Sequence, residues 1–161
     1  MQCKENVNKM QDVDKNYSSG NFSIEFLVKE RGTKMVMKML IPIVNTAALP
    51  KTYRFLSQNS PTVLKTTCYN EGNLPFHQEV KSTEIGHLFE HLLLDYLCLE
   101  KVKDGHSLAE HCGRTDWNWE KDPWGLFYIF VDSGKKDRKY FRKATFQSIS
   151  LLEKLLETEK R

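Results

Sequence analysis

The sequence lacks the long apolar stretch that a membrane-spanning helix or a secretory signal peptide needs. Its apolar runs are short or broken by charges, and its first twenty residues, MQCKENVNKMQDVDKNYSSG, are polar. A transmembrane helix requires about 20 consecutive apolar residues, and a signal peptide requires an apolar core. We therefore expect no membrane partner, a cytoplasmic location and a flexible polar tail over residues 1–20, followed by a single domain over residues 21–161.

An excess of charge of either sign is also missing. The 24 basic residues are nearly balanced by 21 acidic ones, which leaves a net charge of +3 over 161 residues. Domains that bind nucleic acid usually carry a much stronger basic surface, so we do not expect a nucleic-acid partner. The run KKDRKYFRK at residues 135–143 is the densest basic segment. It either binds a polyanion or forms the solvated face of a helix.

Several chemical motifs are absent. The four cysteines include no Cys-x-x-Cys pair, which argues against a structural zinc knot and favours reduced thiols. The chain contains neither a glycine-rich phosphate loop nor a nucleophilic serine elbow. Its length leaves no room for an ATPase or ligase module beside the domain. The composition is compatible with self-association but does not require it.

The hydrophobic pattern predicts an α+β fold. FSIEFLV and KMVMKMLI flank residues 30–33, where Gly32 can supply a positive φ, so they form a hairpin. Leucines cover most of the circumference of a helix after Ser82, GLFYIFVD is typical of a buried strand, and residues 137–159 have amphipathic helical spacing. We therefore expect a mainly antiparallel sheet with an N-terminal hairpin, packed against a buried central helix and a long C-terminal helix.

The sequence HLFEH at residues 87–91 lies in that central helix. Residues four apart on a helix share one face, so His87 and His91 can bind one ion, while Glu90 lies beside them. This is the inverted zincin pattern, in which zinc activates water and the glutamate is the catalytic base. The alternative is that both histidines are buried and satisfied by backbone carbonyls.

A zinc site needs a third ligand from another element. Asp132, at the end of the predicted strand, is the first choice, and Glu153 on the last helix is an alternative. Glu100 lies about 13 Å beyond His91 along the helix axis, which is too far. Asp95, one turn after His91, is suited to orienting the imidazole of His91 by accepting a hydrogen bond from the ring nitrogen that does not bind the metal.

An ordered series of motifs over residues 49–156 resembles the N-terminal domain of cyanophycin synthetase. The series comprises a cysteine and a glycine, the Gly-His-x-x-Glu-His helix with a later acid, a Gly-Arg-Thr turn and an acid after a strand. Here these features fall on Cys68, Gly72, Gly86, His87, Glu90, His91, Asp95, Gly113, Arg114, Thr115 and Asp132.

The resemblance implies a domain that holds a peptide-like polymer such as cyanophycin and that, in some members, resembles a metallopeptidase. The ligase domains of the synthetases are not present, so polymer synthesis is not expected. Lys135 and Lys136 stand where the family usually has glutamates, a difference that would weaken any metal site that used those acids.

Two hypotheses follow. The first is a zinc-dependent hydrolase of amide bonds, with His87, His91 and Asp132 as ligands. The second is a non-catalytic module of the same fold that binds a polymer, a peptide or a protein. Arg114 can bind a substrate carboxylate through its planar fork. Trp117 and Trp119 either stack on guanidinium groups of the substrate or cover the leucine-rich helix.

Overall fold

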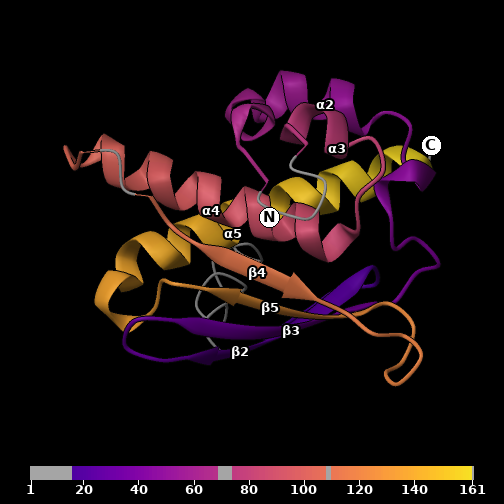
Figure 1. Cartoon of the computed structure of the whole chain (residues 1–161), viewed down its shortest axis with the longest axis horizontal. Coiled ribbons are helices and arrows are strands. Elements are labelled where there is room, and N and C mark those ends of the chain that lie inside the picture. The colour runs from indigo at the N-terminus through magenta and orange to yellow at the C-terminus, as the bar shows by residue number, and fades with distance from the viewer. Residues whose placement is uncertain (1–15, 69–73, 108–109, 161) are drawn as a thin grey trace, which may run out of the picture.

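A computed structural model describes residues 16–68, 74–107 and 110–160. These residues form one five-stranded antiparallel sheet with helices on one face (Figure 1). The spatial order of the strands is β1-β2-β3-β5-β4. Their bounds are Asn16–Ser18 for β1, Phe22–Val28 for β2, Thr33–Met39 for β3, Gly113–Asp116 for β4 and Leu126–Val131 for β5. The predicted α+β class is confirmed.

The predicted hairpin is formed by β2 and β3, in a register that places Phe22 opposite Met39. Gly32 does not have the positive φ expected of it, which is found instead at Gly105 and Gly125. A Cβ atom on Gly32 would lie 2.8 Å from the Phe130 ring, which is 41% exposed, so a larger residue here would have to displace that ring. The predicted polar tail extends too far, because residues 16–18 form β1.

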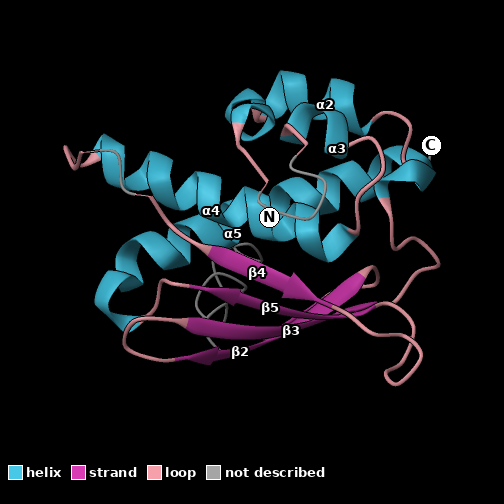
Figure 2. Ribbon diagram, in the orientation of Figure 1, coloured by secondary structure: helices cyan, strands magenta, loops and turns pink. Residues whose placement is uncertain are grey.

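The helices form two layers above the sheet (Figure 2). The α4 and α5 pair packs together, and α4 also contacts β4 and β5, while the smaller α2 and α3 lie further from the sheet. The bounds are Thr52–Asn59 for α2, Phe76–Glu79 for α3, Ile85–Lys103 for α4 and Arg138–Glu157 for α5. The predicted central and C-terminal helices are thereby confirmed. None of the helices in the described ranges is long and apolar enough to cross a membrane.

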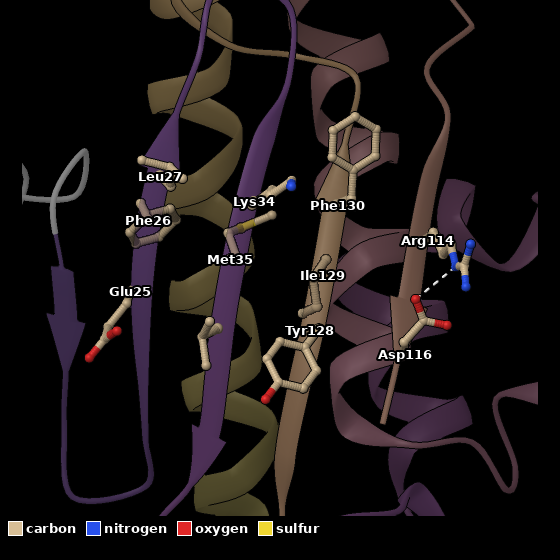
Figure 3. Close-up of a pocket in the computed structure, with 11 residues that line it drawn as sticks. Glu25, Phe26, Leu27, Lys34, Met35, Arg114, Asp116, Tyr128, Ile129 and Phe130 are labelled. Carbon is tan, nitrogen blue, oxygen red and sulfur yellow. Dashed lines mark ion pairs between the residues drawn. The ribbon is translucent and has the colours of Figure 1, made fainter. Parts of the chain in front are cut away.

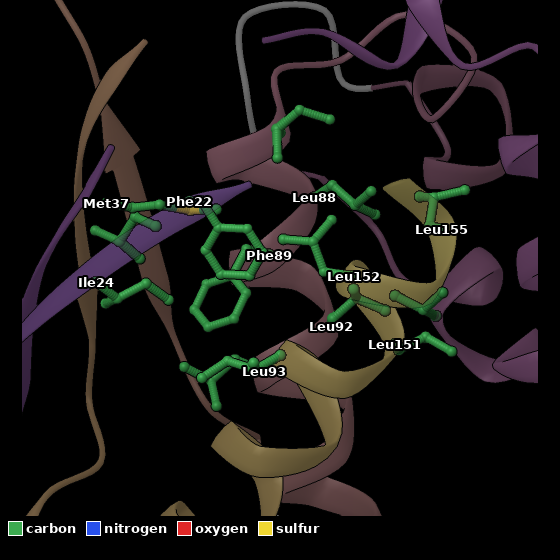
Figure 4. Close-up of a cluster of buried hydrophobic side chains, with 14 of the residues drawn as sticks. Phe22, Ile24, Met37, Leu88, Phe89, Leu92, Leu93, Leu151, Leu152 and Leu155 are labelled. Carbon is green, nitrogen blue, oxygen red and sulfur yellow. The ribbon is translucent and has the colours of Figure 1, made fainter. Parts of the chain in front are cut away.

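The core lies between the inner face of the sheet and the α4 and α5 pair (Figure 4). Leu88, Phe89, Leu92 and Leu93 of α4 are all fully buried. Burial of such a side chain contributes about 1.5–3 kcal/mol, so α4 is held firmly against the sheet. This packing fixes the position of the polar residues that α4 carries at its first turns.

Gly86 allows α4 to approach the sheet closely. A Cβ atom at this position would fall on the ring of Phe127, which is fully buried in β5. We expect Gly86→Ala to lower the free energy of unfolding by about 1–3 kcal/mol, because the ring has no space to move. Urea denaturation would measure the change. Gly20→Ala is the control, because a Cβ atom there meets nothing within 4 Å; equal losses in both variants would contradict this explanation.

Candidate metal centre

The first turns of α4 bring two histidines to a cysteine from another segment. The Nε2 atoms of His87 and His91 are 3.2 Å apart, and Sγ of Cys68 lies 3.3 Å from Nε2 of His87. All three candidate ligand atoms lie within 4.8 Å of one another. We call Cys68, His87 and His91 the three-ligand cluster. One thiol and two imidazoles this close together can hold a metal ion.

Threonine hydroxyls contact the outer nitrogen of each imidazole. Oγ1 of Thr66 is 3.0 Å from Nδ1 of His91, and Oγ1 of Thr83 is 2.7 Å from Nδ1 of His87. The hydroxyl of Thr66 donates its only hydrogen to the carbonyl of Val63, at 2.7 Å. It must therefore accept the hydrogen on Nδ1 of His91. This tautomer leaves the lone pair of Nε2 directed at the cluster, which is the form that binds metal.

The surroundings of the histidines favour their neutral state. The ring of His91 stacks on Phe76 with centroids 3.9 Å apart. Burial lowers the pKa of His91 to about 3, and the neighbouring His87 adds to this effect. Burial also lowers the pKa of His87. The side chain of His87 is 13% exposed.

Glu90 lies beside the cluster and beneath β4. Its Oε2 atom is 3.9 Å from Nε2 of His87 and accepts a hydrogen bond of 3.1 Å from the hydroxyl of Thr115. A Cβ atom on Gly113 would lie 2.8 Å from Oε1 of Glu90, so this glycine leaves room for the carboxylate. Burial raises the pKa of Glu90 to about 7. A carboxylate with such a pKa is suited to proton transfer near neutral pH.

The hydroxyl of Thr66 should matter for metal affinity. We expect Thr66→Val to weaken binding of a divalent metal by roughly 10–100-fold, as is typical when the partner of a ligating histidine is removed. Competition titration with a chromophoric chelator would measure this change. Thr62→Val is the matched control, because the hydroxyl of Thr62 bonds to Asp95 rather than to a histidine. Equal affinities for the two variants would contradict the role given to Thr66.

Neither a scan of protein-family models nor a search of curated proteins finds a match to this chain. The geometry of the described residues therefore carries the functional interpretation.

Two predicted residues, Asp132 and Asp95, have partners other than His87 and His91. Asp132 contacts Nδ1 of His111 at 3.1 Å and is not part of the three-ligand cluster. Asp95 accepts a hydrogen bond from Thr62 at 2.6 Å, whereas Thr66 contacts His91. Cys68 thus takes the place expected for Asp132, and Thr66 the place expected for Asp95. Gly72, which is part of the family resemblance, lies outside the described residues.

The predicted substrate-binding residues lie apart from the cluster. Arg114 pairs with Asp116 at 2.7 Å and lines a shallow hollow of about 770 Å³ on the outer face of the sheet (Figure 3). The indole of Trp119 donates to the carbonyl of Leu126, and its ring packs against Phe127. Trp117 also packs against Phe127 but is 38% exposed. The two tryptophans therefore cover Phe127 of β5, and Trp119 also packs against the core cluster to which the leucines of α4 belong.

Sequence reasoning does not connect three residues of the site with the histidines: Cys68, Thr66 and Thr83. A lone cysteine 19 positions before His87 has no metal-ligand spacing, and threonines are too common to stand out. The available signal is chemical, because a thiol is a better ligand for a zinc-like metal than the carboxylate sought at Asp132.

Proposed function

We propose that this chain is a zinc-dependent hydrolase of amide bonds in peptide-like substrates. Cys68, His87 and His91 would hold the ion, and Glu90 would be the general base. The observation that carries the proposal is the approach of a buried carboxylate to within 3.9 Å of a ligand nitrogen in the three-ligand cluster. Three protein ligands with a nearby glutamate are typical of catalytic zinc, which keeps one position open.

The donor set and its spacing support zinc. Thiolates and imidazoles favour zinc over magnesium and calcium, which prefer oxygen ligands. Two imidazole nitrogens on one tetrahedral zinc ion lie about 3.3 Å apart, and a thiolate lies about 3.6 Å from each nitrogen. The separations in the cluster are 3.2 Å between the nitrogens of His87 and His91, and 3.3 Å between Cys68 and His87. Small movements of the side chains would complete the coordination.

Amide hydrolysis assigns a definite task to each group. A zinc ion in the cluster would lower the pKa of water and polarise the substrate carbonyl. Glu90 accepts a proton from water as the water oxygen bonds to the carbonyl carbon. The C–N bond then breaks, and Glu90 returns the proton to the departing amine. The hydroxyl of Thr115, which donates to Oε2 of Glu90, keeps the carboxylate in position.

The substrate class comes from the resemblance to the N-terminal domain of cyanophycin synthetase. We propose kinship with that domain and a peptide-like polymer as substrate. The Gly-His-x-x-Glu-His sequence from Gly86 to His91 and the position of Cys68 support this kinship. The replacement of the family's glutamates by Lys135 and Lys136 does not alter the proposed ligand set, which uses neither position.

A non-catalytic binding module is the second candidate. The observation in its favour is that 3.2 Å is also a hydrogen-bond distance. If His87 accepts from Thr83 at Nδ1, its Nε2 carries the hydrogen and can donate to Nε2 of His91. In that arrangement the histidines satisfy each other without a metal.

Metal analysis separates the two candidates. We expect purified protein to hold one zinc ion per chain, measured by inductively coupled plasma mass spectrometry. Zinc at one hundred times its dissociation constant should stabilise the stripped protein by about 2.7 kcal/mol, measured by urea denaturation. Magnesium is the control and should give no stabilisation. Protein that binds no zinc, with unchanged stability on its addition, would favour the binding module.

A further inference from the structure

The sheet has an open edge next to the metal centre. β4 is the last strand in the spatial order, so no other strand of the described residues pairs with its outer side. An edge strand presents a row of backbone N–H and C=O groups that an extended chain can join as a further strand. Many sheets have an open edge, but this one lies beside Glu90.

The register shows which residues offer their backbone to the open side. The N–H of Asp132 donates to the carbonyl of Cys112 at 3.0 Å, so this pair is hydrogen-bonded across β4 and β5. Hydrogen-bonded and non-hydrogen-bonded pairs alternate along antiparallel strands. Arg114 therefore bonds to β5, whereas Gly113 and Thr115 direct their N–H and C=O groups away from β5.

The same two residues lie against the proposed general base. Thr115 donates to Oε2 of Glu90, and a Cβ atom on Gly113 would meet Oε1. Gly86 of α4 packs against β5. Measured around the helix axis from Gly86, Glu90 lies at about 40°, where it contacts β4, and His87 lies at about 100°, on the side of Glu90 away from β5. A strand added to β4 would therefore pass on the side of α4 that carries the three-ligand cluster.

We infer that the open edge of β4 binds the substrate as an extended peptide strand, through the backbone of Gly113 and Thr115, and so presents a peptide carbonyl beside Glu90. This inference rests on the hydrolase function proposed above and names how that site holds its substrate. Recognition through the backbone tolerates many side-chain sequences, because every peptide offers the same N–H and C=O groups.

Side chains of the bound strand would alternate between two environments. Those on the side of α4 would face the cluster and Glu90. Those on the other side would lie beside Arg114 and Asp116, which are exposed and paired with each other. The edge therefore selects for an extended backbone, and the exposed Arg114 and Asp116 leave room for side chains of many kinds.

A pair of variants at one position tests this inference. Thr115→Val and Thr115→Pro both remove the hydroxyl that contacts Glu90, but only proline removes the N–H on the open side. Proline is tolerated on an edge strand where the N–H faces outward, so pairing with β5 is retained. The probes are a randomised octapeptide library and the same library N-methylated at every second residue.

Binding is measured in the Glu90→Gln background, by mass spectrometry of peptides retained with the protein on a size filter. We expect Thr115→Val to retain the ordinary library and Thr115→Pro to retain at least tenfold less. The N-methylated library should not be retained or compete. Equal retention by the valine and proline variants, retention of N-methylated peptides, or no retention by either variant would overturn the inference.

Hydrolysis and zinc content are measured in parallel in the same Thr115 variants with Glu90 left unchanged. Retention of the ordinary library without zinc or cleavage would leave edge binding standing and remove the hydrolase proposal. If Thr115→Val and Thr115→Pro bind zinc and cleave the library equally well, the hydrolase proposal stands and edge binding is removed. Melting curves of both variants confirm that each is folded at the assay temperature.

Discussion

Replacing Glu90 with glutamine is expected to lower cleavage of the octapeptide library by about 10²–10⁴-fold, the usual contribution of a general base. Glutamine has the shape of glutamate and keeps an oxygen that can accept the hydrogen bond from Thr115, but it cannot take a proton from water. Stoichiometric zinc should remain, because Glu90 is not in the three-ligand cluster. Rate and zinc content are measured on the same preparation.

Glu100→Gln is the matched control for this experiment. Glu100 lies on the same helix and is also buried, but its carboxylate pairs with Lys103 at 3.0 Å and lies away from the cluster. We expect the folded Glu100→Gln protein to cleave the library at the rate of the natural sequence. Unchanged cleavage by Glu90→Gln would rule out a catalytic base at this position.

The elements that sequence reasoning predicts correctly are those whose pattern is local. Alternation along residues 22–39 is sufficient to predict the hairpin, and the leucines after Ile85 predict a buried helix. By contrast, β1 is three residues long, with the polar sequence NYS, and is stabilised by pairing with β2. Its formation depends on a neighbouring strand, which its own pattern does not reveal.

The same division applies to the candidate metal centre. His87, Glu90 and His91 are related by helical spacing, and the structure brings them together at the first turns of α4. Cys68 joins them only because the chain before α3 returns to α4, and Thr66 for the same reason. Long-range contacts of this kind leave no periodic trace in the sequence. The acid at the end of β5, Asp132, pairs with His111 instead, and only the fold shows that Cys68 is the third member of the cluster.

Replacing Cys68 with alanine is expected to lower zinc affinity by about a hundredfold. Structural zinc sites with four protein ligands bind with about 10–16 kcal/mol, so an even division among the ligands gives at least about 2.5 kcal/mol for one thiolate, which is roughly a hundredfold in affinity. The variant should also lose the zinc-dependent stabilisation of the fold at moderate zinc concentrations. Competition with a chromophoric chelator measures the affinity, and cobalt substitution adds the thiolate charge-transfer band as a direct sign of sulfur ligation.

Cys98→Ala and Cys112→Ala are the controls, because the three-ligand cluster includes neither residue. Both variants should bind zinc with the affinity of the natural sequence and keep the cobalt–thiolate band. Since Cys68 is buried, its replacement also leaves a small cavity, which lowers stability in the absence of metal. Zinc affinity, rather than stability alone, therefore identifies the ligand. A Cys68→Ala protein that binds zinc as tightly as Cys98→Ala would remove the thiolate from the site and reopen the search for a third ligand.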